Sequence, residues 1–239
     1  MTELLFHNDA YQKKFEATIT DVDGNWVALD KTAFYPTGGG QPCDTGVLET
    51  ESGSDLIVAE TMKQDGVVWH RLVNVDGVKP DMKVTGQIDW TRRHWFMRIH
   101  TASHVLSRLL IQEAGVSVSG NNLSSEKARI DFTLEDFDKE YMQTFEKKTN
   151  ELLAKDLPVK TEFLSREEAA QEKEVFTLLK ELPESIKQIR VVQVGEDPVI
   201  DRSACGGTHL NRTGEVGKVK FLKLENKGSQ RRRISFTLE

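Results

Sequence analysis

The chain has no apolar run of the roughly 18–20 residues that a membrane-spanning helix requires. Residues 1–9 also lack the basic start and the long apolar core of a signal peptide. We therefore expect a cytoplasmic protein without a membrane partner. Cysteine is scarce, because Cys43 and Cys205 are the only two in 239 residues. A reducing compartment disfavours a disulfide between them, and a lone cysteine near histidines is more often a metal ligand or a catalytic group.

The formal net charge of −6 gives no support to a role with nucleic acid. The distribution of charge is more informative, because basic residues gather near the C-terminal end. They are Arg212, Lys218, Lys220, Lys223, Lys227, Arg231, Arg232 and Arg233. A chain of negative total charge can still present one basic face to phosphates. The alternative is a solvated surface without a partner.

Residues 1–88 have the pattern of a small all-β domain. Short β-branched and apolar runs alternate with turn signals, and Asp-Gly pairs at Asp23-Gly24 and Asp65-Gly66 are strong hairpin signals. Regular short strands of this kind predict a small β-barrel. With 239 residues, the chain is long enough for a second domain with its own core.

Residues 89–239 mix helix and strand patterns, which predicts an α+β two-layer sandwich after the barrel. Asp89 is expected to cap a long helix that ends at Gly115. A polar loop is expected at 118–123, and a second helix opened by Thr133 and Asp136 is expected to end at Pro158. Ser165 is expected to cap a short third helix. Strands are expected at 128–132, 159–164, 189–194, 218–224 and 232–238.

A loop between Pro36 and Pro42 contains three consecutive glycines, Gly38, Gly39 and Gly40. Glycine permits positive φ angles and close approach of backbone to a ligand, so the loop is a candidate contact for phosphate or ribose. The plainer interpretation is a sharp turn between strands. No lysine follows in the Walker pattern, which excludes a nucleotide P-loop.

Two half-sites carry the metal-binding chemistry. His100 and His104 lie four residues apart in the expected helix, so both imidazoles project from one helix face. Cys205 and His209 form a second pair far downstream. Imidazole and thiolate are the ligands that zinc prefers, so the four residues predict one zinc site per chain.

A histidine-rich ligand set is more typical of catalytic zinc than of structural zinc. Four protein ligands would fill a tetrahedron, so either one ligand is loose, the coordination expands, or the ion positions substrate without activating water. Two other hypotheses stay open. One is a structural zinc, and the other is Cys205 as a nucleophile with His209 or His100 as its base.

Several sequence motifs together resemble the editing domain of alanyl-tRNA synthetases. They are His-Thr-Ala-Ser-His at 100–104, Cys-Gly-Gly-Thr-His at 205–209, the glycine-rich loop at 34–42 with Asp44 and Gly46, Arg-Ile-Asp-Phe at 129–132, and the basic segment at 227–234. They are spread over nearly the whole chain. The resemblance extends to the freestanding AlaX-type editing proteins that keep an N-terminal barrel, and it implies a barrel at 1–88 and an editing domain at 89–239.

The resemblance implies hydrolysis of the ester in mischarged tRNA(Ala), chiefly seryl-tRNA(Ala), with glycyl-tRNA(Ala) as a second candidate. ATP would be needed only indirectly, by the synthetase that charges the tRNA. The zinc ligands would be His100, His104, Cys205 and His209. Candidate catalytic or substrate-binding residues are Thr101, Ser103, Thr208 and Asp201, and candidate contacts to the acceptor end of tRNA are Gly38, Gly39, Gly40, Gln41, Arg231, Arg232 and Arg233.

One departure from the family pattern concerns substrate choice. The synthetase domain commonly has a glutamine in the loop after the first helix, where this chain has Val118 or Ser119. Two alternative functions also remain. One is the related threonyl-type editing of seryl-tRNA, and the other is a zinc-stabilised RNA-binding module without turnover. Comparing hydrolysis of the two seryl-tRNAs separates the first alternative, and tRNA binding without turnover identifies the second.

Overall fold

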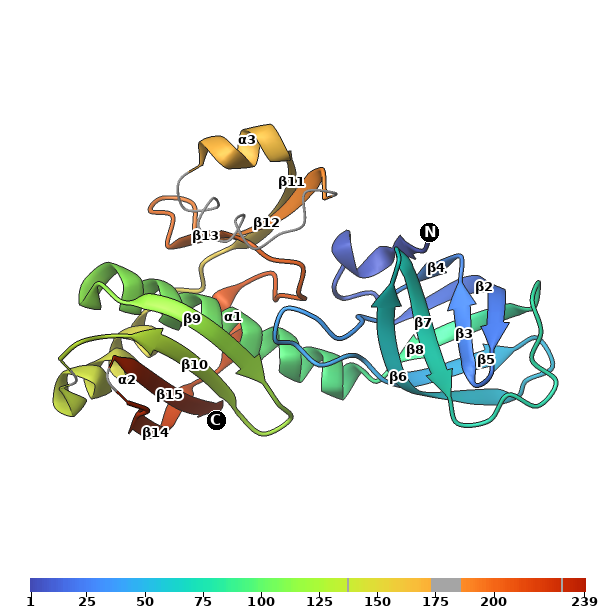
Figure 1. Ribbon diagram of the computed structural model, residues 1–239, viewed down its shortest axis with the longest axis horizontal. Helices are drawn as coiled ribbons and strands as arrows, with labels where there is room; N and C mark the ends of the chain where they lie inside the picture. Colours follow the sequence, from blue (N-terminus) through green and yellow to red (C-terminus); the bar gives the residue numbers. More distant parts are fainter. Residues whose placement is uncertain (137, 173–185, 229) are drawn as a thin grey trace. The chain divides into compact units, whose positions relative to one another are not determined.

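The computed structural model describes residues 1–136, 138–172, 186–228 and 230–239 (Figure 1). The chain divides into two compact units, Met1–Phe96 and Met97–Glu239. The helix α1 (Trp90–Ala114) begins in the first unit and lies mostly in the second. The proposed domain boundary at residue 88 precedes this helix.

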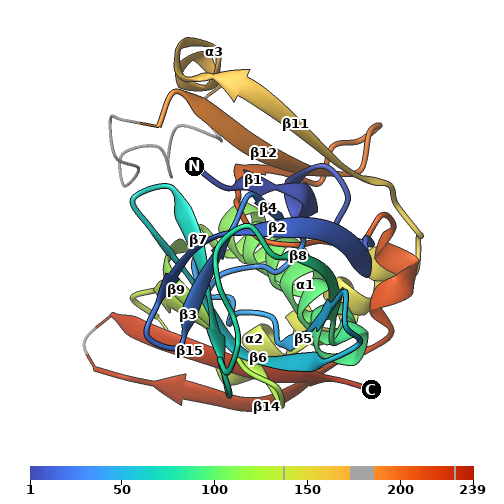
Figure 2. The ribbon, with the colours of Figure 1, turned by 90° about the vertical axis from the view of Figure 1, so that its right-hand side faces the viewer.

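The first unit contains a closed antiparallel barrel with the strand order β2-β3-β7-β6-β5-β8 (Figure 2). The strands are β2 (Lys14–Asp23), β3 (Trp26–Leu29), β5 (Gly46–Thr50), β6 (Asp55–Gln64), β7 (Val67–Leu72) and β8 (Lys83–Ile88). Two short strands, β1 (Glu3–Leu4) and β4 (Lys31–Thr32), pair in parallel, and a 3-10 turn, η1 (Leu5–His7), follows β1. The predicted barrel is confirmed.

Alternation of side chains along the strands forms the barrel core. Phe15, Ala17 and Ile19 on β2 are buried, while their neighbours face outward or lie half-buried. The β6–β7 hairpin shows why the Asp-Gly signal was reliable. Asp65 and Gly66 both have positive φ, at 50° and 80°, which a two-residue turn of type I′ requires.

The second unit contains a four-stranded antiparallel sheet in the order β14-β15-β10-β9. Its strands are β9 (Ser117–Leu123), β10 (Ala128–Thr133), β14 (Val219–Asn226) and β15 (Arg231–Leu238). Figures 1 and 2 show α1 and α2 (Lys139–Leu153) on the same side of this sheet. Ile130 and Phe132 of β10 are fully buried, as are Ile234 and Phe236 of β15. Helices on one sheet face make the two-layer α+β arrangement that was predicted.

A second, three-stranded sheet has the order β11-β12-β13. It consists of β11 (Val159–Ser165), β12 (Gln188–Val194) and β13 (Asp201–Ala204), and α3 (Arg166–Gln171) follows β11. Ser165 and Glu168 form the expected capping box at the start of α3. A short 3-10 turn, η2 (Thr213–Val216), precedes β14.

The predicted polar loop at 118–123 is wrong, because these residues form most of β9. Among the described strands, β9 lies at the sheet edge and pairs only with β10. Most of its side chains are exposed, so its sequence does not alternate between apolar and polar residues. The pattern that predicts a strand is therefore absent.

The start and end of the second helix were also predicted wrongly. Thr133 is the last residue of β10, and α2 starts at Lys139 because the Asp138 carboxylate accepts hydrogen bonds from the amides of Glu140 and Tyr141. The helix ends at Leu153, before Pro158. Phe137 falls within the range predicted for this helix but lies outside the described residues. Among those described, no helix combines the length and apolarity needed to cross a bilayer.

Candidate metal centre

The helix α1 supplies the first half of the metal centre. The Asp89 carboxylate accepts a hydrogen bond from the Arg92 amide at 3.1 Å, and Gly115 follows the helix with φ of 64°. His100 and His104 therefore lie well inside the helix, with ring centroids 5.1 Å apart. Ile99 before the pair, Ala102 within it and Val105 after it are buried, so packing anchors the helix on both sides of the histidines.

The loop after β13 supplies the second half, and Arg190 fixes its backbone. The Arg190 guanidinium donates from Nη1 to the carbonyls of Cys205 and Gly207, at 2.8 and 2.9 Å. The Cys205 amide donates to the carbonyl of Arg190 at 3.0 Å. Between the strand predicted at 189–194 and this loop, the structure has a further strand, β13, which was not predicted. Arg190 itself was missed, because its partners lie 15 and 17 residues away.

The four predicted ligands come together. Cys205 Sγ lies 3.7 Å from His100 Nε2 and 3.4 Å from His209 Nε2. One ligand atom from each of His100, His104, Cys205 and His209 lies within 4.8 Å of the others. Bonds of about 2.0–2.1 Å to nitrogen and about 2.3 Å to sulfur place a nitrogen and a sulfur ligand of tetrahedral zinc about 3.6 Å apart, and two nitrogen ligands about 3.3 Å apart. The cluster therefore fits a metal ion of this size.

The electrostatics of the cluster favour a thiolate. Burial raises the pKa of Cys205, but the facing imidazoles of His100 and His209 outweigh burial and hold that pKa well below its ordinary value. Burial, together with His100, lowers the pKa of His209 to about 3. Burial also opposes the charged form of His104, yet the Cys205 thiolate and Asp201 raise its pKa to about 10. Metal binding would therefore displace a proton from His104.

The other candidate residues lie beside the ligands. Thr101 is fully buried, with Oγ1 3.2 Å from His209 Nδ1. Ser103 donates to the carbonyl of Ile99 at 2.8 Å, four residues earlier in the helix. Asp201 lies 2.8 Å from His104 Nδ1. Thr208 is fully buried next to His209.

The glycine-rich loop of the first unit is a tight turn. Gly38 and Gln41 exchange backbone hydrogen bonds of 3.1 and 2.9 Å, and the Tyr35 hydroxyl donates to the Gly38 carbonyl at 2.9 Å. Gly39 and Gly40 have φ of 55° and 81°, which explains the need for glycine. Gly39 is exposed and Gln41 is buried, so the tip of the turn is open to solvent.

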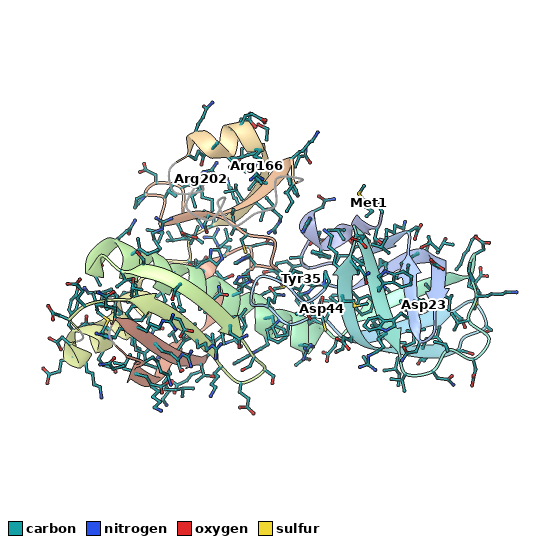
Figure 3. All side chains as sticks on the ribbon, in the orientation of Figure 1. Met1, Asp23, Tyr35, Asp44, Arg166 and Arg202 are labelled. Carbon is teal, nitrogen blue, oxygen red and sulfur yellow. The ribbon has the colours of Figure 1, made fainter. Side chains whose placement is uncertain are left out.

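A fully buried ion pair holds both ends of this loop. Arg93 pairs with Asp44 and also donates to the carbonyl of Ala33. The Asp44 carboxylate accepts the Tyr35 amide at 2.7 Å (Figure 3). Arg93 Nη1 also donates a hydrogen bond to the carbonyl of Ala10 at 2.8 Å. The local sequence around Arg93 did not predict this role, because the partners of Arg93 lie 49–83 residues away along the chain.

Strand alternation separates the three consecutive arginines of β15. Arg231 is exposed, and Arg233 pairs with Asp131 across the sheet. Arg232 is buried on the other face, where it donates at 2.7 Å to the Asn226 side chain and to the Gly228 carbonyl. A cavity of about 510 Å³ is lined by Ser119, Asp131, Lys227, Arg231, Arg232 and Arg233.

Comparison with family models gives two matches. Residues 5–92 match the model described as tRNA synthetases class II (A). Residues 189–235 match the model described as the threonyl and alanyl tRNA synthetase second additional domain. The second match includes Cys205 and His209.

Curated relatives extend the similarity over the full chain. A protein of Methanosarcina barkeri named alanyl-tRNA editing protein AlaX-M is 44% identical over 100% of this chain and 99% of its own length. A protein of the same name from Saccharolobus solfataricus is 39% identical, with complete coverage of both chains. The alanine–tRNA ligase of Pyrococcus abyssi is 40% identical over 94% of this chain and 24% of its own length.

Proposed function

The chain belongs to the AlaX-M family of alanyl-tRNA editing proteins, and from this membership we propose that it hydrolyses the ester of mischarged tRNA(Ala). The preferred substrate is seryl-tRNA(Ala), with glycyl-tRNA(Ala) as a second candidate. The observation that carries the proposal is the cluster of three histidines and one cysteine, two members of which lie in the segment that matches the editing-domain model.

The chemistry gives a reason for such an enzyme. A synthetase cannot strongly reject a small amino acid that differs from its own by one methyl or hydroxyl group, because binding discriminates too little. A second hydrolytic site that accepts the wrong amino acid corrects the error. An aminoacyl ester is an activated bond, so a well-placed electrophile and water suffice to break it.

In this proposal, His100, His104, Cys205 and His209 hold one zinc ion. Bound zinc polarises a carbonyl or lowers the pKa of a coordinated water towards about 7. The surrounding residues fix the ligands. Arg190 holds the backbone of the Cys205 loop, and Thr101 orients His209 through its Nδ1 atom. Thr101, Ser103 and Thr208 are our candidates for contact with the seryl hydroxyl, because their hydroxyls lie in the segments that carry the ligands.

The test is deacylation of seryl-tRNA(Ala) and alanyl-tRNA(Ala) by zinc-loaded and zinc-stripped protein. We expect serine to be released at least about tenfold faster than alanine, and only by the zinc-loaded protein. Seryl-tRNA(Thr) is the matched control for the threonyl-type alternative, and its faster hydrolysis would redirect the proposal to that tRNA. Binding of tRNA without turnover by loaded protein would instead identify a non-catalytic RNA-binding module.

For the tRNA, we propose contacts from the glycine-rich loop and from the exposed face of β15. Gly38, Gly39, Gly40 and Gln41 form the open turn described above. Arg231 and Arg233 lie on the exposed sheet face beside the basic cavity. Arg232 belongs to the same segment but holds the turn before β15.

Charge reversal at Arg231 tests the sheet contact. Arg231→Glu is expected to weaken tRNA binding several-fold and to reduce the slope of log K against log salt by about one, because a phosphate contact releases condensed counterions. The matched control is Lys147→Glu, which makes the same charge change at a side chain that is 83% exposed on α2. Equal effects of the two variants on binding and salt slope would remove Arg231 from the interface.

A further inference from the structure

We propose that Asp201 is a positioning residue that sets the ring orientation and tautomer of the ligand His104, and that Arg108 and Ser203 hold Asp201 for this task. The inference rests on the metal-holding part of the proposed function. Asp201 Oδ2 lies 2.8 Å from His104 Nδ1, and the other carboxylate oxygen accepts Arg108 Nε at 3.0 Å. Ser203 donates to Oδ2 at 2.9 Å.

Two regular elements bring these groups together. His104 and Arg108 are four residues apart on α1, so they occupy the same helix face. Asp201 and Ser203 are two residues apart on β13, so they occupy the same face of that strand. The helix face carries the ligand His104 and the cation Arg108. It lies against the strand face that carries the Asp201 carboxylate and the Ser203 hydroxyl. The sequence separation of 93–99 residues explains why no local pattern revealed the pairing.

The chemistry of the carboxylate determines the tautomer. An ionised carboxylate only accepts hydrogen bonds, so neutral His104 must carry its proton on Nδ1 and leave the lone pair on Nε2. The carboxylate also raises the basicity of the imidazole and therefore strengthens it as a ligand. His209 is oriented differently, since the neutral hydroxyl of Thr101 faces its Nδ1 atom.

Burial makes the arrangement rigid. Asp201 is 5% exposed and Arg108 is 9% exposed. A buried carboxylate needs a partner charge, and Arg108 supplies one without competing for the histidine nitrogen, because guanidinium has no acceptor. Arg108 therefore fixes the orientation of the Asp201 carboxylate next to the ligand.

A neighbouring ion pair provides a matched control. Arg202 follows Asp201 in the chain and points to the opposite face of β13. Its Nε atom pairs with Glu172 Oε2 at 2.6 Å. Arg202 also pairs with Glu162. This network shares the strand with Asp201 but has no described contact with the four ligands. Glu172→Gln therefore breaks an arginine–carboxylate pair on β13 without touching His104.

The first measurement is the zinc affinity of the metal-stripped protein, in competition with a chromophoric chelator. Asp201→Asn is expected to weaken zinc binding about 10–100-fold, because the amide cannot hold Arg108 and His104 as the carboxylate does. Glu172→Gln is expected to stay within about twofold of the unmodified protein. Equal affinities for the two variants would overturn the inference.

The second measurement uses the unmodified, zinc-loaded protein, so it does not depend on the folding of a variant. Histidine nitrogen NMR is expected to show a proton on Nδ1 of His104 and zinc bound through Nε2. Zinc bound through Nδ1 of His104 would overturn the inference. Neither measurement uses tRNA. Failure of the proposed deacylase activity would therefore leave the role of Asp201 standing, and failure of the Asp201 role would leave the proposed activity standing.

Discussion

Cys205→Ser is expected to remove zinc from the purified protein and to lower the rate of seryl-tRNA(Ala) hydrolysis by about 10³-fold or more. The thiolate is the only anionic ligand of the four. A serine hydroxyl does not ionise near neutral pH and is a poor zinc ligand. A loss of about 10³-fold corresponds to roughly 4 kcal/mol of transition-state stabilisation, which is in the range expected for loss of a polarising ion.

Metal content and rate must be measured on the same preparations. Cys43→Ser is the matched control, since Cys43 is the other cysteine and lies buried in the first unit. It is expected to keep one zinc per chain. If Cys205→Ser kept its zinc and lost only its activity, the result would favour Cys205 as a nucleophile over the metal mechanism.

The second large effect is expected in the first unit. Arg93→Met should lower the free energy of unfolding of that unit by about 3–5 kcal/mol, because it leaves the fully buried Asp44 carboxylate without its positively charged partner. The four tryptophans, Trp26, Trp69, Trp90 and Trp95, all lie in the first unit. Tryptophan fluorescence during denaturant unfolding therefore reports on the relevant part of the chain.

Two further variants separate this effect from a general cost of losing arginine. Arg71→Met breaks the ion pair between Arg71 and Glu60, whose side chains are 37% and 48% exposed, respectively. It should lower the free energy of unfolding by less than about 1 kcal/mol. Replacing both Arg93 and Asp44 with apolar residues should recover a large part of the loss, because no unpaired charge remains. A cost for Arg93→Met no larger than that for Arg71→Met would contradict the burial argument.

The sequence predicted most of the elements because their signals are local. Alternation of apolar and polar residues predicted the barrel strands. The Asp65-Gly66 pair predicted a hairpin, and both residues have the positive φ angles that its turn requires. The capping box at Ser165 was equally local. The strand β9 was missed because it lies at a sheet edge, where polar side chains carry no period-two signal.

The candidate site shows the same division between local and distant information. Each ligand pair was predicted from its i, i+4 spacing, and the structure brings the two pairs together. Arg190 and Arg108 were not predicted, because they contact residues that the fold alone places beside them. Alternation along β15 could have shown that Arg232 faces away from Arg231 and Arg233.

The cluster joins segments that lie far apart along the chain, since His100 and Cys205 are separated by 105 residues. An ion held by all four ligands would therefore also be a cross-link, closing a loop that includes α2, α3, the whole three-stranded sheet and part of the four-stranded sheet. By analogy with a disulfide, closing a loop of about 100 residues removes about 4–5 kcal/mol of conformational entropy from the unfolded chain. The same four side chains that would hold the ion for the proposed hydrolysis would thus limit how far the second unit can unravel.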